Sequence, residues 1–228
     1  MCRMFGMVAE RPITPRDLLH DAPRSLRALS REHPDGWGIA VHDDRGWAVE
    51  RGTSCAHACE RFAAAGDRAA QIVIAHVRKK TVGPTALVNT HPFRRGDLVF
   101  AHNGTLTDAQ ALASRTAPEH LAAIEGDTDS ERLFAFVLTH IDTAGDVSRG
   151  TATAVRALHA LASAGTASFL LSCGARLYAH RLGRTLVVLD RAGATLVASE
   201  PLTDEPWTEL PERSLLELEP GCRSALAA

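Results

Sequence analysis

Two kinds of hydrophobic pattern succeed one another along the chain. Runs rich in β-branched and large apolar residues predict strands at residues 2–8, 36–42, 46–51, 71–77, 97–102, 167–173, 175–181, 185–190 and 194–199. Apolar residues spaced three and four positions apart predict helices at residues 17–29, 56–65, 130–141 and 151–164. The order of elements is therefore strands, helices and strands again, which is not a strict strand–helix alternation.

This order predicts an α+β fold, in which the sheets are largely antiparallel and the helices lie on their outer faces. The last four predicted strands have glycine at their turns, at Gly174, Gly183 and Gly193, and we interpret them as a meander. Residues 142–150 are the best candidate for a flexible loop. Residues 1–228 are expected to form one domain, because this length suffices for a single sizeable core.

Composition narrows the class of protein. The chain is 45% apolar and 23% charged with a net charge of −2, which gives no electrostatic reason to expect nucleic acid or an anionic membrane as a partner. No apolar stretch is long enough to span a bilayer, and the amino terminus lacks a secretory signal pattern. A cytoplasmic enzyme with a small-molecule substrate is expected, and the five scattered cysteines are expected to be reduced.

Cys2 directly follows the initiator methionine, so the expected removal of Met1 would make Cys2 the first residue. Its thiol and the new α-amine would then belong to one residue. An α-amine has a pKa of about 7.7–8.0, so part of it is uncharged at neutral pH and can accept the thiol proton. Cys2 is therefore a candidate nucleophile that carries its own general base, although a small apolar residue starting a strand is the simpler interpretation.

Three further residues or pairs are candidates for a site. Arg78 lies just past an apolar run, and its planar guanidinium suits the carboxylate of an amino acid. His91 could pair or donate near such a site. Asn103 and Gly104 follow a predicted strand and favour a tight turn. Alternatively, the Asn103 side-chain amide and the Gly104 N–H converge on one oxygen, as an oxyanion hole requires.

Two carboxylates stand at the start of the predicted helix at 130–141. Asp127, Thr128, Asp129 and Ser130 are all suitable helix N-caps, and one of them is expected to serve as the cap. A carboxylate beside the cap could instead bind a substrate ammonium group, or a magnesium ion. The residues alone leave open which of Asp127 and Asp129 faces a pocket.

In combination and in order, these motifs resemble the class II glutamine amidotransferases, which are amino-terminal-nucleophile hydrolases. The residues that carry the resemblance are Met1-Cys2-Arg3, Asp35-Gly36-Trp37-Gly38, Ala75-His76-Val77-Arg78, Asn89-Thr90-His91-Pro92-Phe93, His102-Asn103-Gly104 and Thr128-Asp129-Ser130-Glu131. The chain is most similar to the short stand-alone members, including the ergothioneine-pathway γ-glutamyl amidohydrolase, and residues 197–202 resemble those members more loosely. The resemblance implies a four-layer αββα sandwich of two mostly antiparallel sheets with helices outside.

The resemblance also implies roles for particular residues. Cys2 would be the nucleophile and its freed amine the base, while Asn103 and the Gly104 N–H would form the oxyanion hole. Arg78 would hold the substrate α-carboxylate, and Asp129 the α-ammonium together with the Gly104 carbonyl. The residues expected to line or shape the pocket are Thr81 and His91, with Asp35, Gly36 and Trp37 forming the wall beside the nucleophile.

The expected activity is hydrolysis of a γ-glutamyl amide through a γ-glutamyl thioester, with release of glutamate from a γ-glutamyl metabolite. The leaving amine stays open. If it were ammonia from glutamine, a separate ammonia-accepting synthetase would be needed as a partner, because the chain has neither a P-loop nor a Rossmann glycine pattern. The pair Lys79-Lys80 departs from the family, which often has a small residue between its arginine and threonine.

Two rival classes of function remain. A catalytically silent γ-glutamyl-binding protein would result if Met1 were retained. A metal-dependent enzyme could use His76, His91, Asp127 and Asp129, although their spacing matches no known metal motif. Residues 55–59, with two cysteines around a histidine, also contain metal-binding side chains, but no second pair follows at a suitable spacing. We therefore expect neither a metal nor another cofactor.

Overall fold

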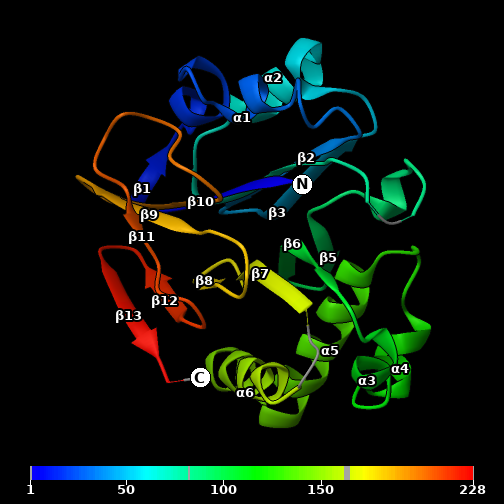
Figure 1. The fold of residues 1–228 in the computed structure, drawn as a ribbon. Helices are drawn as coiled ribbons and strands as arrows, with labels where there is room; N and C mark the ends of the chain where they lie inside the picture. Colours follow the sequence, from blue (N-terminus) through cyan, green and yellow to red (C-terminus); the bar gives the residue numbers. More distant parts are fainter. Residues whose placement is uncertain (1, 82, 162–164, 228) are drawn as a thin grey trace.

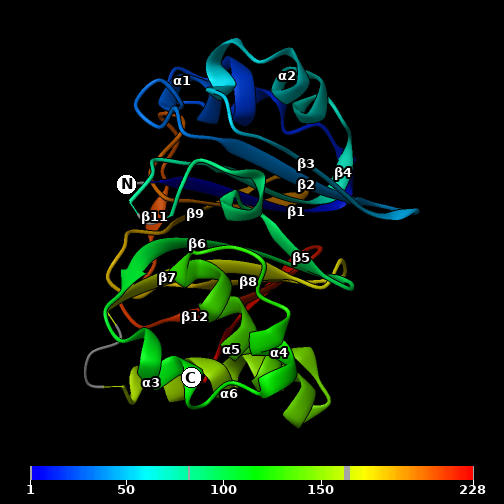
Figure 2. The same ribbon diagram turned by 90° about the vertical axis from the view of Figure 1, so that its right-hand side faces the viewer.

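The chain forms four layers, with two antiparallel sheets packed face to face and helices on both outer faces (Figures 1 and 2). The computed structural model describes residues 2–81, 83–161 and 165–227. The first sheet has the strand order β11-β9-β10-β1-β4-β2-β3. Its strands are β1 (Arg3–Ile13), β2 (Trp37–Asp43), β3 (Gly46–Gly52), β4 (Ala70–Val77), β9 (Val187–Arg191), β10 (Ala194–Ala198) and β11 (Thr208–Glu209).

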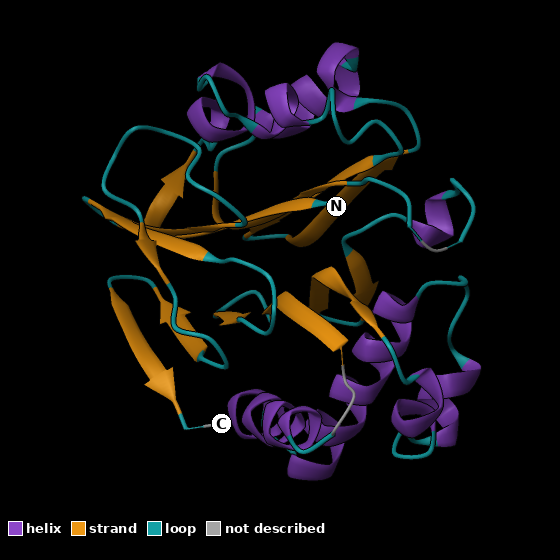
Figure 3. Ribbon diagram, viewed as in Figure 1, coloured by secondary structure: helices purple, strands orange, loops and turns teal. Residues whose placement is uncertain are grey.

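The second sheet has the order β13-β12-β8-β7-β6-β5. Its strands are β5 (Phe93–Arg95), β6 (Leu98–Leu106), β7 (Gly165–Ser172), β8 (Leu177–His180), β12 (Leu215–Glu219) and β13 (Cys222–Leu226). The helical segments, purple in Figure 3, are η1 (Asp17–Asp21), α1 (Leu26–Leu29), η2 (Ala56–Ala58), α2 (Glu60–Gly66), η3 (Leu87–Asn89), α3 (Ala109–Ala113), α4 (Pro118–Ala122), α5 (Asp129–Ala144) and α6 (Val147–His159). The α+β class and the four-layer arrangement expected from the sequence are confirmed.

Alternation along β1 explains the layering. Because successive side chains of a strand point to opposite faces, Phe5 and Met7 join the apolar core under α1 and α2, whereas Met4 and Val8 join the core between the two sheets. A strand that is apolar on both faces can be buried on both faces. The first residues of β1 are consequently held in place from above and below.

Helices α5 and α6 cover the outer face of the second sheet. Leu133, Phe134 and Val137 of α5 are buried in one apolar core with residues of β6 and β7. The rings of Phe134 and Phe100 stack with their centroids 4.9 Å apart. This packing fixes the amino-terminal end of α5 relative to β6.

The predicted meander of the last four strands is wrong. Strands β7 and β8 form a hairpin in the second sheet, whereas β9 and β10 form a hairpin in the first, where β10 pairs with β1. Gly183 therefore lies in a connection that crosses between the sheets rather than in a hairpin turn. Both hairpins have the same local pattern, so only their long-range partners decide to which sheet each belongs.

The predicted loop at 142–150 is also wrong, because α5 continues to Ala144 and α6 begins at Val147. The reversal needs only two residues: Gly145 adopts a left-handed conformation with φ 65°, and the Asp146 side chain caps α6 by accepting from the Arg149 N–H.

Other predicted boundaries shift or are missed. The helices predicted at 17–29 and 56–65 are each broken into two short segments. The helix predicted at 151–164 begins earlier and ends at His159, and residues 162–164 lie outside the described residues. The sequence patterns missed β5, the short helices α3 and α4, and the terminal strands β11, β12 and β13.

Candidate active site

A cavity of about 270 Å³ gathers segments that are distant in the sequence. It is lined by the start of β1, the residues after β4, the carboxy-terminal part of β6, the start of α5, the β8–β9 connection and the residues after β10. The lining residues are Cys2, Arg3, Arg78, Lys79, Thr81, His91, His102, Asn103, Gly104, Thr105, Thr128, Asp129, Ser130, Gly183, Arg184, Thr185, Ser199 and Glu200. The cavity thus contains Cys2 and most of the polar residues that the sequence singled out.

Cys2 immediately precedes β1, whose pairing of Arg3 with Val77 brings the thiol to the end of β4. The Lys79 N–H donates to Cys2 Sγ over 3.3 Å, and Sγ lies 3.4 Å from the Lys79 carbonyl oxygen. Burial raises the pKa of the Cys2 thiol, while the Lys79 N–H and the nearby Arg78 guanidinium oppose that rise. The thiol is therefore predominantly protonated at neutral pH and needs a base. Met1, whose removal was expected, lies outside the described residues.

Arg78 follows β4 and its side chain is almost fully buried at the cavity. Its Nη1 donates to the Pro84 carbonyl over 3.1 Å. Burial lowers the pKa of this guanidinium, although an arginine stays charged at physiological pH. A buried cation facing a cavity is a suitable partner for a carboxylate.

The segment 35–37, expected to form the wall beside the nucleophile, lies behind this arginine and is not among the residues that line the cavity. The Arg78 N–H donates to the Gly36 carbonyl over 2.8 Å, and the Asp35 carboxylate accepts from the Lys80 N–H over 2.8 Å. Trp37 is directed to the helix side of its sheet, where its ring packs edge-on against Phe62 of α2. Asp35 and Gly36 therefore fix the backbone that carries Arg78, whereas Trp37 belongs to the core.

Asn103 and Gly104 do not form a turn, because β6 continues without interruption to Leu106. Asn103 Nδ2 donates to the Cys2 carbonyl over 3.2 Å and to Ser199 Oγ over 2.8 Å. At Gly104 a Cβ atom would overlap the carbonyl oxygen of Thr166 on β7, so this position requires glycine. The glycine is needed for a close approach between strands, not for a positive φ.

Asp129 lines the cavity, whereas Asp127 does not border it. Asp129 is the first residue of α5, and its Oδ2 accepts from the Leu106 N–H over 2.8 Å. Thr128 is the N-cap and its side chain accepts from the Glu131 N–H. The helix cap and the cavity carboxylate are therefore different side chains, adjacent in the sequence.

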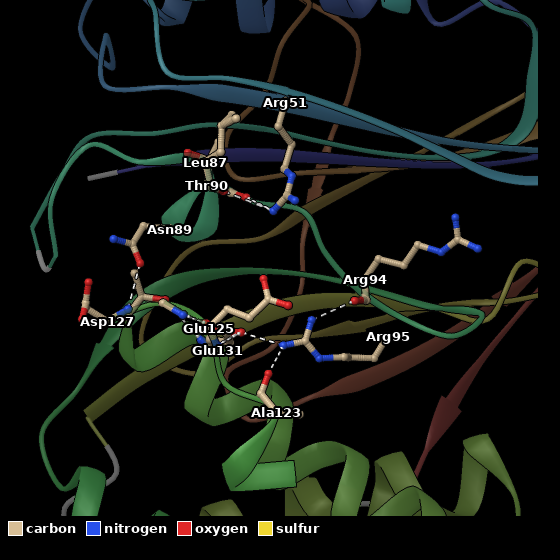
Figure 4. A network of polar contacts seen from close by, with 12 residues as sticks. Arg51, Leu87, Asn89, Thr90, Arg94, Arg95, Ala123, Glu125, Asp127 and Glu131 are labelled. Atoms are coloured by element: carbon tan, nitrogen blue, oxygen red, sulfur yellow. Dashed lines mark hydrogen bonds and ion pairs between the residues drawn. The ribbon is translucent and has the colours of Figure 1, made fainter. Parts of the chain in front are cut away.

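A polar network holds the loop before α5 (Figure 4). The buried Glu131 carboxylate accepts from the N–H groups of Glu125 (3.0 Å) and Gly126 (2.7 Å) and pairs with Arg95 at 2.8 Å. The Asp127 N–H donates to Asn89 Oδ1 over 2.9 Å. These bonds hold residues 125–127, which lead into α5, against the segment that precedes His91. They thereby fix the position of Asp129 at the start of α5.

Thr81 and His91 both line the cavity, as expected, but they differ in exposure: Thr81 is exposed and His91 is buried. The His91 ring stacks on His76 with centroids 4.3 Å apart. Burial lowers the pKa of His76 to about 3 and that of His91 well below its ordinary value. Both imidazoles are therefore uncharged at neutral pH.

Within residues 2–81, 83–161 and 165–227, no three His, Cys, Asp or Glu side chains are grouped to hold a metal ion. His57 Nε2 lies 2.9 Å from an Arg31 nitrogen, and the Cys55 thiol contacts the Ser30 carbonyl. His102 lies between the Ser130 hydroxyl (2.8 Å) and the Thr166 carbonyl (3.3 Å). These ligand-capable side chains thus have other partners.

Several cavity residues were not singled out from the sequence. Arg3 donates to the Glu200 carboxylate over 2.7 Å and to the Cys2 carbonyl over 3.1 Å. Ser199 links β1 to Asn103 through its hydroxyl, which accepts from the Met4 N–H over 2.9 Å. Only the loose resemblance of residues 197–202 pointed to this part of the chain. The β8–β9 connection carried no signal at all, because its contribution depends on the crossing between sheets.

The model of the class II glutamine amidotransferases matches residues 1–194, and the chain belongs to this family. The family comprises amidotransferase and hydrolase enzymes, and this chain is one of them.

Among its relatives is the γ-glutamyl-hercynylcysteine sulfoxide hydrolase of Mycobacterium tuberculosis, which is 32% identical over 96% of this chain and 93% of that protein. The hydrolase of the same name from Mycolicibacterium smegmatis is 28% identical, with 96% of each chain covered.

Solved structures share the fold at lower identity. A glutamine aminotransferase class-II domain protein from Silicibacter pomeroyi superposes with a TM-score of 0.72, with 21% identity over 99% of this chain and 98% of that one. The glutamine phosphoribosylpyrophosphate amidotransferase of B. subtilis gives a TM-score of 0.77, but the match covers only 49% of that larger chain. Among the described residues, no helix has the length and apolar character needed to cross a membrane.

Proposed function

We propose that the protein hydrolyses a γ-glutamyl amide bond, with the Cys2 thiolate as nucleophile and a γ-glutamyl thioester as intermediate. The observation that carries this proposal is the composition of one cavity. It brings together the thiol, a buried arginine and a carboxylate, each fixed by backbone hydrogen bonds. These are the groups that a nucleophilic attack on an amino-acid side-chain amide needs.

In this proposal Arg78 and Asp129 recognise the glutamyl head. The Arg78 guanidinium takes the α-carboxylate, while the Asp129 carboxylate and the Gly104 carbonyl take the α-ammonium. All three lie on rigid supports: the end of β4, the first turn of α5 and the interior of β6. Thr81 and His91 complete the lining. Such preorganised opposite charges fix the γ-carbonyl relative to the thiol, which lowers the entropic part of the barrier.

Removal of Met1 would free the α-amine of Cys2, which then takes the thiol proton. The raised pKa of the thiol is consistent with the need for this base. The thiolate attacks the γ-carbonyl carbon, the amine returns the proton to the leaving nitrogen, and the C–N bond breaks. Water then attacks the thioester, which releases glutamate and restores the thiol.

Negative charge develops on the γ-carbonyl oxygen during each attack. We propose that Asn103 Nδ2 and the Gly104 N–H stabilise this oxygen. In the substrate-free protein Nδ2 donates to the Cys2 carbonyl, so it would exchange that bond for one to the oxyanion. At comparable sites the loss of one such donor costs about 3–4 kcal/mol of transition-state stabilisation.

The relatives favour a metabolite rather than free glutamine as substrate. The two mycobacterial hydrolases match 96% of this chain and 93% and 96% of their own lengths. We therefore propose that the leaving amine is a larger group, as in the γ-glutamyl metabolites named for those hydrolases. An ammonia-accepting synthetase as partner is the second candidate.

The test is glutamate release from a panel that runs from free glutamine through γ-glutamyl dipeptides and glutathione to γ-glutamyl sulfur-containing betaines. The Cys2→Ala variant serves as the control for each substrate. Turnover of one large substrate that is lost in Cys2→Ala supports a dedicated amidohydrolase. Turnover of glutamine alone would instead favour the ammonia-supplying role.

Absence of any Cys2-dependent release would contradict the catalytic proposal and leave the silent γ-glutamyl-binding protein. The intact mass of the purified chain should be measured beside the assay. A mass that retains Met1 would contradict the role of the Cys2 amine.

A further inference from the structure

We propose that Arg184 forms the leaving-group half of the site and binds a carboxylate on the departing amine, so that the preferred substrates are γ-glutamyl amides of α-amino acids. This inference rests on the proposed γ-glutamyl hydrolysis and specifies its substrate. The observations concern the Arg184 side chain, the charges around it and the loop that carries it.

Arg184 lines the same cavity as Cys2 and is only partly exposed. Its Nε is shielded from solvent and has no hydrogen-bond partner among the described residues. No ion pair of its guanidinium occurs within those residues either. Leaving a buried donor unsatisfied costs free energy, so a guanidinium in this position is suited to an anion that arrives with the substrate.

The charges in the cavity point to a substrate with two carboxylates. A γ-glutamyl head has one carboxylate and one ammonium, for which Arg78 and Asp129 suffice. Glu200 already pairs with Arg3. Lys79 also lines the cavity, but this residue is exposed to solvent. Arg184 is then the partly buried cation of the cavity for which the described residues provide no counter-ion. Burial is the main cause that lowers the pKa of His102. The Asp129 charge opposes this shift and the Arg184 charge adds to it, so both charges act on one imidazole at the cavity wall.

The charges of the cavity residues match those of a γ-glutamyl amino acid. When the departing amine is an α-amino acid, it bears its own carboxylate near the scissile nitrogen. Glutamine and simple alkyl amides lack that group, so they would leave Arg184 unpaired.

The loop that carries Arg184 is held in place rather than free. The Ser168 hydroxyl, fully buried on β7, donates to the Arg184 carbonyl over 2.7 Å and accepts from the Leu182 N–H over 3.0 Å. The Gly183 N–H donates to the Glu212 carboxylate over 2.7 Å. A guanidinium on an anchored backbone loses less conformational freedom when it binds a carboxylate.

The test compares two substrates that differ only in the carboxylate, γ-glutamylalanine and γ-glutamylethylamide. The wild-type protein should turn over γ-glutamylalanine with the higher kcat/KM. Arg184→Gln should reduce that value roughly 10- to 100-fold, the range expected for loss of a charge-assisted pair. The same variant should change kcat/KM for γ-glutamylethylamide less than about threefold, and Arg184→Lys should recover part of the loss because it keeps the charge.

Arg45→Gln is the matched control, since it removes one positive charge at the exposed turn between β2 and β3. It should leave both substrates unchanged. Equal loss for both substrates in Arg184→Gln, or no preference of the wild-type protein for the carboxylate, would overturn the inference while the hydrolase proposal stands. No Cys2-dependent turnover of either substrate would overturn the hydrolase proposal itself.

Discussion

Asp127 and Asp129 show how two neighbouring residues of one type are separated by their surroundings. Both precede or begin the same helix, and their sequence positions suit either role. The structure places Asp129 at the cavity and ties the Asp127 backbone to Asn89, outside the lining. The difference follows from the helix start: Asp129 is the first residue of α5, whereas Asp127 precedes the N-cap Thr128 and lies in the loop that is bonded to Asn89.

A pair of aspartate variants tests this separation. Asp129→Asn removes the negative charge that we assign to the substrate ammonium but keeps an oxygen for the Leu106 N–H. We expect KM for the preferred substrate to rise roughly 10-fold or more, since a charged hydrogen bond is worth about 1.5–3 kcal/mol. Asp127→Asn is the matched control and should leave KM unchanged. The reverse pattern in steady-state kinetics would assign the ammonium to Asp127.

At the scale of elements, helix ends and hairpins decide where the chemistry lies. The reversal between α5 and α6 was predicted as a long loop, but it consists of two residues. Glycine and aspartate are strong signals for a C-cap followed by an N-cap. The short reversal is therefore indicated by two adjacent residues of the sequence, Gly145 as the C-cap of α5 and Asp146 as the N-cap of α6.

Substitution of Gly145 tests the backbone conformation of this junction, because an added Cβ atom would contact no other residue. Gly145 has φ 65°, and a Cβ atom built there would have no neighbour within 4 Å. Gly145→Ala should lower the free energy of unfolding by about 1 kcal/mol, because only the left-handed backbone conformation is penalised. Gly145→Asn should cost less, since asparagine tolerates this conformation better.

Urea unfolding of the two Gly145 variants provides the measurement, and Cys2-dependent activity at low denaturant should be unaffected in both. An alanine variant as stable as the wild-type protein would show that the reversal is not held by this conformation.

At the scale of the whole molecule, the four-layer packing buries several histidine side chains. His76 and His180 are fully buried, and burial lowers the pKa of each to about 3 from an ordinary 6.5. His180 lies against the His159 ring and the Ala167 carbonyl. Because the folded state disfavours protonation at both, the unfolded state binds more protons at acid pH.

Stability should therefore be fully present above about pH 6.5 and should be lost as pH falls from there toward about 3. The two histidines together give a slope of about 2–3 kcal/mol per pH unit well below 6.5. Urea unfolding at pH 7.5, 6.0 and 5.0 measures this slope. Other buried histidines, His91 among them, add to the measured slope. His180→Gln should therefore reduce the slope by the share of one proton, about 1.4 kcal/mol per pH unit. A stability independent of pH between 7.5 and 5.0 would contradict the burial of these groups in an uncharged form.

Part of this molecule could be predicted because the relevant information is local. The spacing of the apolar residues predicted the α+β class and most of the strands. The order of the short motifs predicted four site residues, Cys2, Arg78, Asn103 and Asp129, and all four line one cavity. The patterns failed where identical local signals have different long-range partners, as in the β7–β8 and β9–β10 hairpins.

The sequence by itself determined which chemical groups the protein has and the faces on which its strands and helices are apolar, since these depend on residue identity and on short spacings. Only the tertiary structure decided that Arg184 and Glu200 border the cavity of Cys2 and that Trp37 does not. The reason is physical. Strand pairing and the crossing between sheets are stabilised by contacts between residues far apart in the chain, and no local pattern records which of those partners will meet.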